Sequence, residues 1–108
     1  MNFLEPRFEQ EYQALDSRVI GIVAVIEALC RSLYYAETTV TSVWRDDKNS
    51  PHYYHRAVDL RSNHLRPEEV LYIVNLINLV YPFNHHNLQT ILWHDVGKGW
   101  HLHVQVRP

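Results

Sequence analysis

The hydrophobic pattern of this sequence switches between a helical and a strand period, and this succession restricts the folds open to the chain. From Asp16 or Ser17 to about Tyr35, apolar residues recur at steps of three and four, which predicts a helix with one buried face. The residues predicted to form that face are Val19, Ile20, Val23, Ile26, Cys30 and Leu33. Segment 38–45, rich in β-branched residues, and the short segment 57–61 are predicted strands.

The second half of the chain shows the same succession. A helix is predicted from Pro67, which suits a first helical position, to the residue before Pro82. Segments 90–96 and 100–106 are predicted strands joined by a glycine-containing turn. This order predicts a two-layer α+β fold, in which a small, mainly antiparallel sheet carries the helices on one face. The length of 108 residues suits a single domain, with residues 1–15 as an arm or a short helix.

Composition excludes several classes of protein. Apolar residues make up 46% and charged residues 20%, as in an ordinary globular domain. The formal net charge of −2 provides no basic surface for nucleic acid. We find no segment typical of a signal peptide or a membrane span, so we expect a protein made in the cytoplasm. The single cysteine, Cys30, excludes an intramolecular disulfide, and its place on an apolar face predicts burial.

Histidine is the residue type that stands out, with eight copies, and it is the commonest metal ligand in proteins. On the last predicted strand, His101, His103 and Gln105 share one face because side chains alternate, and the apolar residues between them face the helices. His85 and His86 lie in a polar connection and are predicted to be solvated. The pair on the strand is therefore the better candidate for half of a metal site.

Two further candidate ligands, His52 and Asp59, lie around the start of the predicted strand 57–61, beside Arg56 and Arg61, which we expect at the surface. A loop that curls back is needed to bring His52 to Asp59. Two imidazoles and a carboxylate are a familiar ligand set for catalytic zinc, which keeps a fourth position for water and supports amide hydrolysis. The same ligand types suit non-haem Fe(II) oxygenases, but those are all-β barrels, so the predicted helices favour zinc.

In this order the motifs resemble the zinc D-alanyl-D-alanine carboxypeptidases and L-alanyl-D-glutamate endopeptidases of peptidoglycan, whose fold is shared with the hedgehog signalling domain. The family pattern of Ser-x-His, six residues and Asp is matched by Ser50, His52 and Asp59. Upstream, TSVWR places Arg45 where the family has an arginine, and WHLHV matches a C-terminal His-x-His on a strand. The resemblance covers roughly residues 38–106.

The resemblance implies a hedgehog/DD-peptidase-like fold in which His52, Asp59 and His103 bind Zn²⁺. It also implies that His101 lies beside the metal, where it would stabilise the tetrahedral intermediate or transfer a proton.

Three other residues are implied to contact substrate. Arg45 would bind a carboxylate or a carbonyl oxygen, a role that suits its planar guanidinium, and Ser50 and His55 would lie beside the substrate.

The sequence departs from the family pattern at two positions. His55 stands where members commonly have glycine, and Trp100 stands where many have an acidic general base. The nearest acid is Asp95, which a tight turn would bring next to the last strand, so the base is expected to be either Asp95 or His101.

The function that the resemblance implies is hydrolysis of stem-peptide amide bonds in peptidoglycan, of either the carboxypeptidase or the endopeptidase type. The short chain, with no signal peptide or wall-binding module, is typical of phage or prophage enzymes that act on the cell wall during lysis or as part of the virion. The alternative is a catalytically inactive zinc-binding module of the same fold, with a structural or interaction role.

Overall fold

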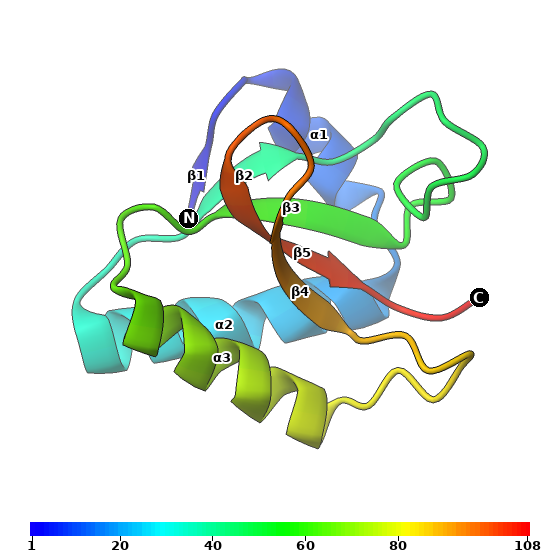
Figure 1. Ribbon diagram of the computed structural model, residues 1–108. Helices are drawn as coiled ribbons and strands as arrows, with labels where there is room; N and C mark the ends of the chain where they lie inside the picture. Colours follow the sequence, from blue (N-terminus) through cyan, green and yellow to red (C-terminus); the bar gives the residue numbers. More distant parts are fainter.

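A mixed five-stranded sheet in the order β1-β2-β3-β5-β4 organises the structure, a computed structural model that describes all 108 residues (Figure 1). The strands are β1 (Asn2–Phe3), β2 (Thr39–Ser42), β3 (Ala57–Arg61), β4 (Ile91–Asp95) and β5 (Trp100–Gln105). The helices are α1 (Arg7–Gln13), α2 (Ser17–Tyr34) and α3 (Pro67–Val80). Only β1 and β2 run parallel, and the other neighbouring strands are antiparallel. The predicted α+β class and mainly antiparallel sheet are therefore confirmed.

The two long helices begin where the sequence predicts. The Asp16 carboxylate accepts a hydrogen bond from the backbone N–H of Arg18 at 2.9 Å, which satisfies a free donor at the start of α2. In α3, Pro67 occupies the first turn, and the carboxylate of Glu69 accepts from the backbone N–H of Arg66 at 2.8 Å.

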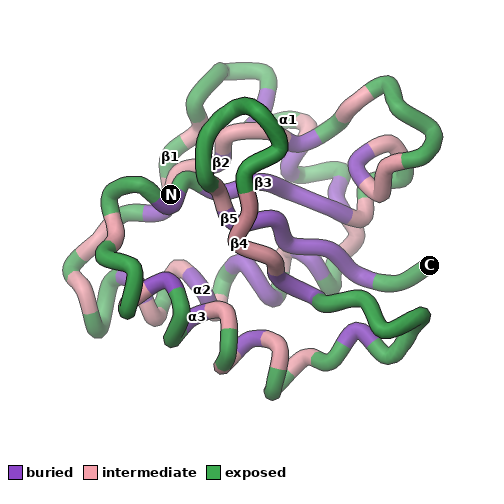
Figure 2. The backbone as a smooth tube through the Cα atoms, in the orientation of Figure 1, coloured by how far each residue is buried: buried purple, intermediate pink, exposed green.

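The core lies between the sheet and the helices α2 and α3, which run along the same side of it (Figure 1). Buried residues are concentrated in β3, β5 and the inner sides of these helices (Figure 2). The completely or almost completely buried apolar side chains include Val23, Ile26, Val58, Leu60, Ile73, Ile77, Leu102 and Val104. Each contributes roughly 1.5–3 kcal/mol of hydrophobic free energy when it leaves water.

One residue of the predicted helical face is misplaced. Cys30 is buried as expected, but Leu33 is 49% exposed. The inner face continues from Cys30 to Tyr34, four residues along, because Tyr34 and not Leu33 packs against the core.

The N-terminal segment is more ordered than an arm. Asn2 and Phe3 form the short parallel strand β1 beside Thr39 and Val40 of β2. The helix α1 follows and buries two aromatic side chains. A strand of two residues has no readable period, so the sequence did not indicate it.

Strand β2 ends earlier than predicted, at Ser42, because the chain turns away there into the segment that carries His52. Strand β3 has the predicted bounds, and the strands predicted over 90–96 and 100–106 differ from β4 and β5 by one residue at their ends. No helix combines the length and the apolar character needed to cross a membrane.

Candidate metal centre

His52 lies in the segment between β2 and β3 and is 1% exposed. Its backbone N–H donates to the Ser50 hydroxyl at 3.2 Å, and its ring Nδ1 lies 2.6 Å from the Val43 carbonyl oxygen. Because a carbonyl oxygen can only accept, Nδ1 donates, and Nε2 is the ring nitrogen left to bind a metal ion. That buried Nε2 has no hydrogen-bond partner and lies 3.3 Å from Oδ1 of Asp59.

His103 approaches the same carboxylate from β5. Its Nδ1 lies 3.0 Å from Oδ1 of Asp59, and its Nε2 lies 3.0 Å from Oε1 of Gln105. The amide nitrogen of Gln105 donates to the carbonyl oxygen of Gln89 at 2.8 Å, which turns Oε1 toward the histidine. With its proton on Nε2 and shared with Gln105, His103 has Nδ1 available to bind a metal ion beside Asp59.

Asp59 sits at the centre of β3 and is 2% exposed. Burial by itself would raise the pKa of this carboxyl, but its interactions with His103 and His52 hold the pKa well below the usual range. The other carboxylate oxygen, Oδ2, pairs with the guanidinium of Arg45. The carboxylate is therefore charged, and it completes the group.

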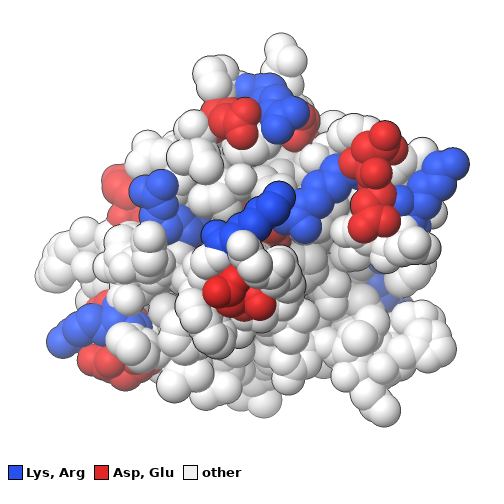
Figure 3. Space-filling view, turned by 45° about the horizontal axis from the view of Figure 1, so that its top comes forward, with Lys and Arg blue, Asp and Glu red and all other residues white.

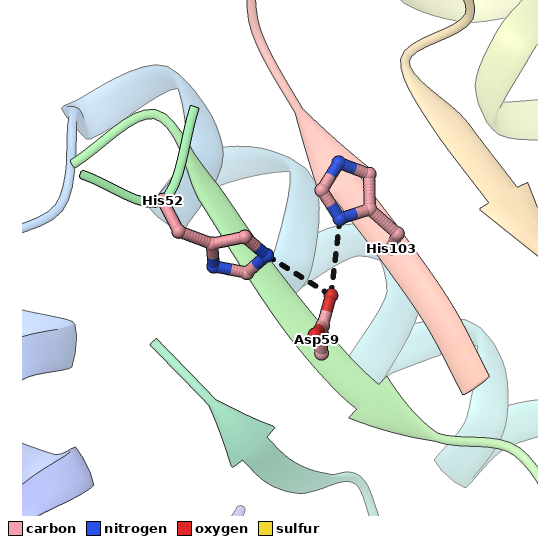
Figure 4. A group of neighbouring side chains, drawn as sticks. All are labelled: His52, Asp59 and His103. Atoms are coloured by element: carbon pink, nitrogen blue, oxygen red, sulfur yellow. Dashed lines mark hydrogen bonds and ion pairs between the residues drawn. The ribbon is translucent and has the colours of Figure 1, made fainter. Parts of the chain in front are cut away.

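The three side chains converge on one point, as Figure 4 shows. The ligand atoms of His52, Asp59 and His103 all lie within 4.8 Å of one another, and all three residues are buried. Ligand atoms at 2.0–2.1 Å from a tetrahedral metal ion lie about 3.3 Å apart, close to the 3.0 and 3.3 Å that separate Oδ1 of Asp59 from Nδ1 of His103 and Nε2 of His52. Two imidazole nitrogens and a carboxylate oxygen form a donor set that fits a metal ion.

Arg45 and His101 lie beside this group. Nε of Arg45 donates to the Ser42 hydroxyl at 3.1 Å, which holds its guanidinium against Asp59. Nε2 of His101 lies 3.7 Å from Oδ2 of Asp59, with 13% of the side chain exposed. Both can therefore reach a molecule bound at the group, and their catalytic roles stay predictions.

Asp95 is not brought to the histidines, which corrects the expectation that the tight turn would do so. In the hairpin it pairs with Trp100 and points away from the face that carries His103. Its carboxylate accepts from the backbone N–H groups of Gly97 and Gly99 at 2.8 and 3.0 Å. These hydrogen bonds lower the pKa of Asp95, and the bond from Gly97 has the largest effect. The side chain therefore stabilises the turn.

His94 takes the place expected for Asp95. It pairs across the strands with His101, and its ring centroid lies 4.8 Å from that of His101 and 5.6 Å from that of His103. Burial, followed by the charges of His101 and His103, lowers the pKa of His94. The signal was present in the sequence, because opposite residues of a hairpin point to the same side.

Ser50 and His55 have local roles in the loop. Ser50 supports the backbone of His52, as described above, and His55 is exposed. The φ angle of His55 is 60°, in the left-handed region that glycine enters without a steric cost. Glycine is therefore the residue that this position would accommodate most easily. The substrate contacts predicted for both residues stay predictions.

A cleft of about 400 Å³ opens beside the metal group, and its walls include Asp59, His101 and Arg45. A larger cavity, of about 560 Å³, lies elsewhere, between α2 and the segment that follows α3, and is lined in part by Arg18 and Phe83. Convergent polar groups rather than size identify a reactive site, so we assign the smaller cleft to the metal group.

No known protein family, no curated protein and no solved structure matches this chain. The likeness to the peptidoglycan peptidases therefore rests on the sequence motifs, and the hedgehog-like fold stays a prediction. The geometry of the site is an independent observation, because it depends only on the positions of the side chains.

Proposed function

We propose that the protein is a zinc-dependent peptidase that hydrolyses stem-peptide amide bonds of peptidoglycan, of the D-Ala–D-Ala carboxypeptidase or the L-Ala–D-Glu endopeptidase type. The observation that carries the proposal is the convergence of three buried ligand atoms from His52, Asp59 and His103. The order of the motifs and the left-handed backbone at His55 support it. The cell wall is the proposed place of action, as for phage-type lysis enzymes.

The chain's own residues can perform the remaining tasks. Zinc held by this group would polarise the substrate carbonyl and lower the pKa of a bound water toward about 7. His101 is the residue we assign to proton transfer, because it flanks Asp59 and because Asp95 points away. Arg45 would orient the substrate by binding a carboxylate or carbonyl oxygen. For this its guanidinium must either bind Asp59 and the substrate together or give up its contact with Asp59.

A second candidate function is a zinc-binding module without catalysis. The observation that favours it is the lack of a second carboxylate at the group once Asp95 is excluded as the base. Metal binding would then serve folding, since the binding free energy of a site that exists only in the folded chain adds to stability.

Mass spectrometry of digested peptidoglycan tests the first function. Zinc-loaded protein is incubated with isolated wall material, and the released and remaining peptides are identified. We expect either loss of the terminal D-Ala or new chain ends at the L-Ala–D-Glu bond. A chelator should abolish the reaction, and added zinc should restore it.

The matched pair of variants is His103→Ala and His85→Ala, since His85 is exposed and outside the group. We expect His103→Ala to lose both bound zinc and hydrolysis, and His85→Ala to keep both. About one zinc per chain without cleavage of any wall peptide would favour the inactive module. Purified wild-type protein that binds no zinc would exclude both functions.

A further inference from the structure

Side chains on the metal-binding face of the sheet form rows across the strands. In one row Asp59 is paired with His103, and in the next Arg61 is paired with His101. Residues two apart on a strand point to the same face, so Arg61 lies about 6.6 Å along the strand from Asp59. The cleft beside the metal group extends over this second row.

Two cationic side chains in this cleft have no partner within the protein. Arg61 and Lys98, the latter from the turn between β4 and β5, are exposed and line the cleft together with Arg45. Arg45 is paired with Asp59, whereas the side chains of Arg61 and Lys98 form no hydrogen bond or ion pair. The carboxylate of Asp95 on the same hairpin is bound to the turn backbone and does not line the cleft.

The charge of the cleft is opposite to that of the whole chain. Three cationic side chains face one carboxylate there, although the protein carries a formal net charge of −2. Figure 3 shows Lys and Arg side chains spread across the middle of the molecule, with Asp and Glu side chains next to several of them. A concave surface with excess positive charge attracts anions, and a bound divalent metal ion would increase that charge further.

We propose that Arg61 and Lys98 form an anion subsite that binds a carboxylate of an acidic peptide, within two residues of the bond held at the metal centre. An extended peptide advances about 3.3–3.6 Å per residue, so two residues span the distance between the rows. The fork of an arginine and the point charge of a lysine both suit a carboxylate. The position of the bond rests on the proposed peptidase function, whereas binding of the carboxylate does not.

The test compares two peptides by calorimetry on the zinc-loaded protein. The probe is L-Ala–D-Glu–L-Lys in which the Ala–Glu amide is reduced to a methylene-amine, so that it cannot be hydrolysed. Its partner is the same peptide with the carboxylates amidated. We expect the free-acid peptide to bind on the order of tenfold more tightly, with a preference that shrinks as salt is raised.

The variant is Arg61→Gln with Lys98→Gln, and the matched control is Lys48→Gln with Arg107→Gln, which removes the same charge from exposed positions outside the cleft. We expect the first to lose the preference for the free acid and the second to retain it. Circular dichroism verifies that both variants are folded. A wild type without the preference, a first variant that retains it, or equal losses in both variants would overturn the subsite.

The subsite and the proposed function fail in different ways. Cleavage of wall peptides combined with an unaltered preference in the Arg61→Gln, Lys98→Gln variant would reject the subsite and leave the peptidase standing. A preference that depends on these two residues, in a protein that cleaves no wall peptide, would support the subsite and reject the peptidase.

Discussion

The two faces of the sheet are both buried at the centre, but they are held together by different interactions. On strand β3, Val58 and Leu60 pack among the apolar side chains of α2 and α3, whereas Asp59 between them meets histidines and an arginine. On β5, Leu102 and Val104 alternate with His103 in the same way. The alternation of a strand thus separates the residues that stabilise the domain from those that form the candidate metal centre.

The difference between the faces has an energetic consequence. Apolar burial is favourable without any partner, but a buried polar or charged group costs free energy unless it is paired. On the metal face, His52 retains an unpaired Nε2 next to the charged Asp59. A bound metal ion is therefore expected to stabilise the contacts on this face. It should not change the packing of the helix-covered face.

The largest effect is expected for Asp59→Asn, which keeps the shape of the side chain and removes its charge. Zinc affinity should fall on the order of a thousandfold, since one of three ligands is lost. Competition with a chromophoric chelator measures this. An unchanged affinity would exclude Asp59 from the ligand set.

The substitution Leu60→Ala, at the next residue, should lower the stability of the fold and leave zinc affinity unchanged. Leu60 is 1% exposed, so its truncation leaves a cavity and should lower the free energy of unfolding by about 2–5 kcal/mol. Zinc bound per folded chain should not change. Urea unfolding measures the free energy of unfolding, and metal analysis measures the zinc bound per chain. A loss of zinc from folded Leu60→Ala protein would show that the two faces are coupled.

A smaller effect is expected for Gln105→Leu, which removes the acceptor for Nε2–H of His103 without altering a ligand. Partners of this kind typically contribute about 10–100-fold to metal affinity, because they fix the tautomer and the ring orientation. Gln105→Glu retains an acceptor oxygen and should bind zinc more tightly than Gln105→Leu. Equal affinity in wild type and Gln105→Leu would show that the glutamine does not position His103.

The smallest effect is expected for Asp95→Asn. The turn should weaken only slightly, since a charged acceptor for two exposed backbone N–H groups becomes a neutral one. Zinc affinity and wall hydrolysis should not change, whereas His101→Ala should lower hydrolysis and leave zinc bound. If Asp95→Asn abolished hydrolysis, the assignment of proton transfer to His101 would be wrong.

Sequence reasoning was most successful where a property is local. The helix starts, strand β3 and the alternation along β5 follow from caps, β-branched residues and period, and all were predicted. It was less successful where a position depends on distant partners: strand β1, the early end of β2, and the exposure of Leu33. The prediction for Asp95 was wrong for another reason: its strand does lie next to β5, but its side chain points to the other face of the sheet.

The sequence by itself determined which residues could bind a metal, since ligand chemistry belongs to the side chain and the two faces of a strand follow from its backbone. Only the tertiary structure decided that the loop closes His52 onto Asp59, that contacts with Val43 and Gln105 leave the inner nitrogen of each histidine facing Asp59, and that two unpaired cations share the cleft. These features depend on contacts between segments far apart in the chain. Such contacts form only when the whole sheet is assembled, so no local pattern records them.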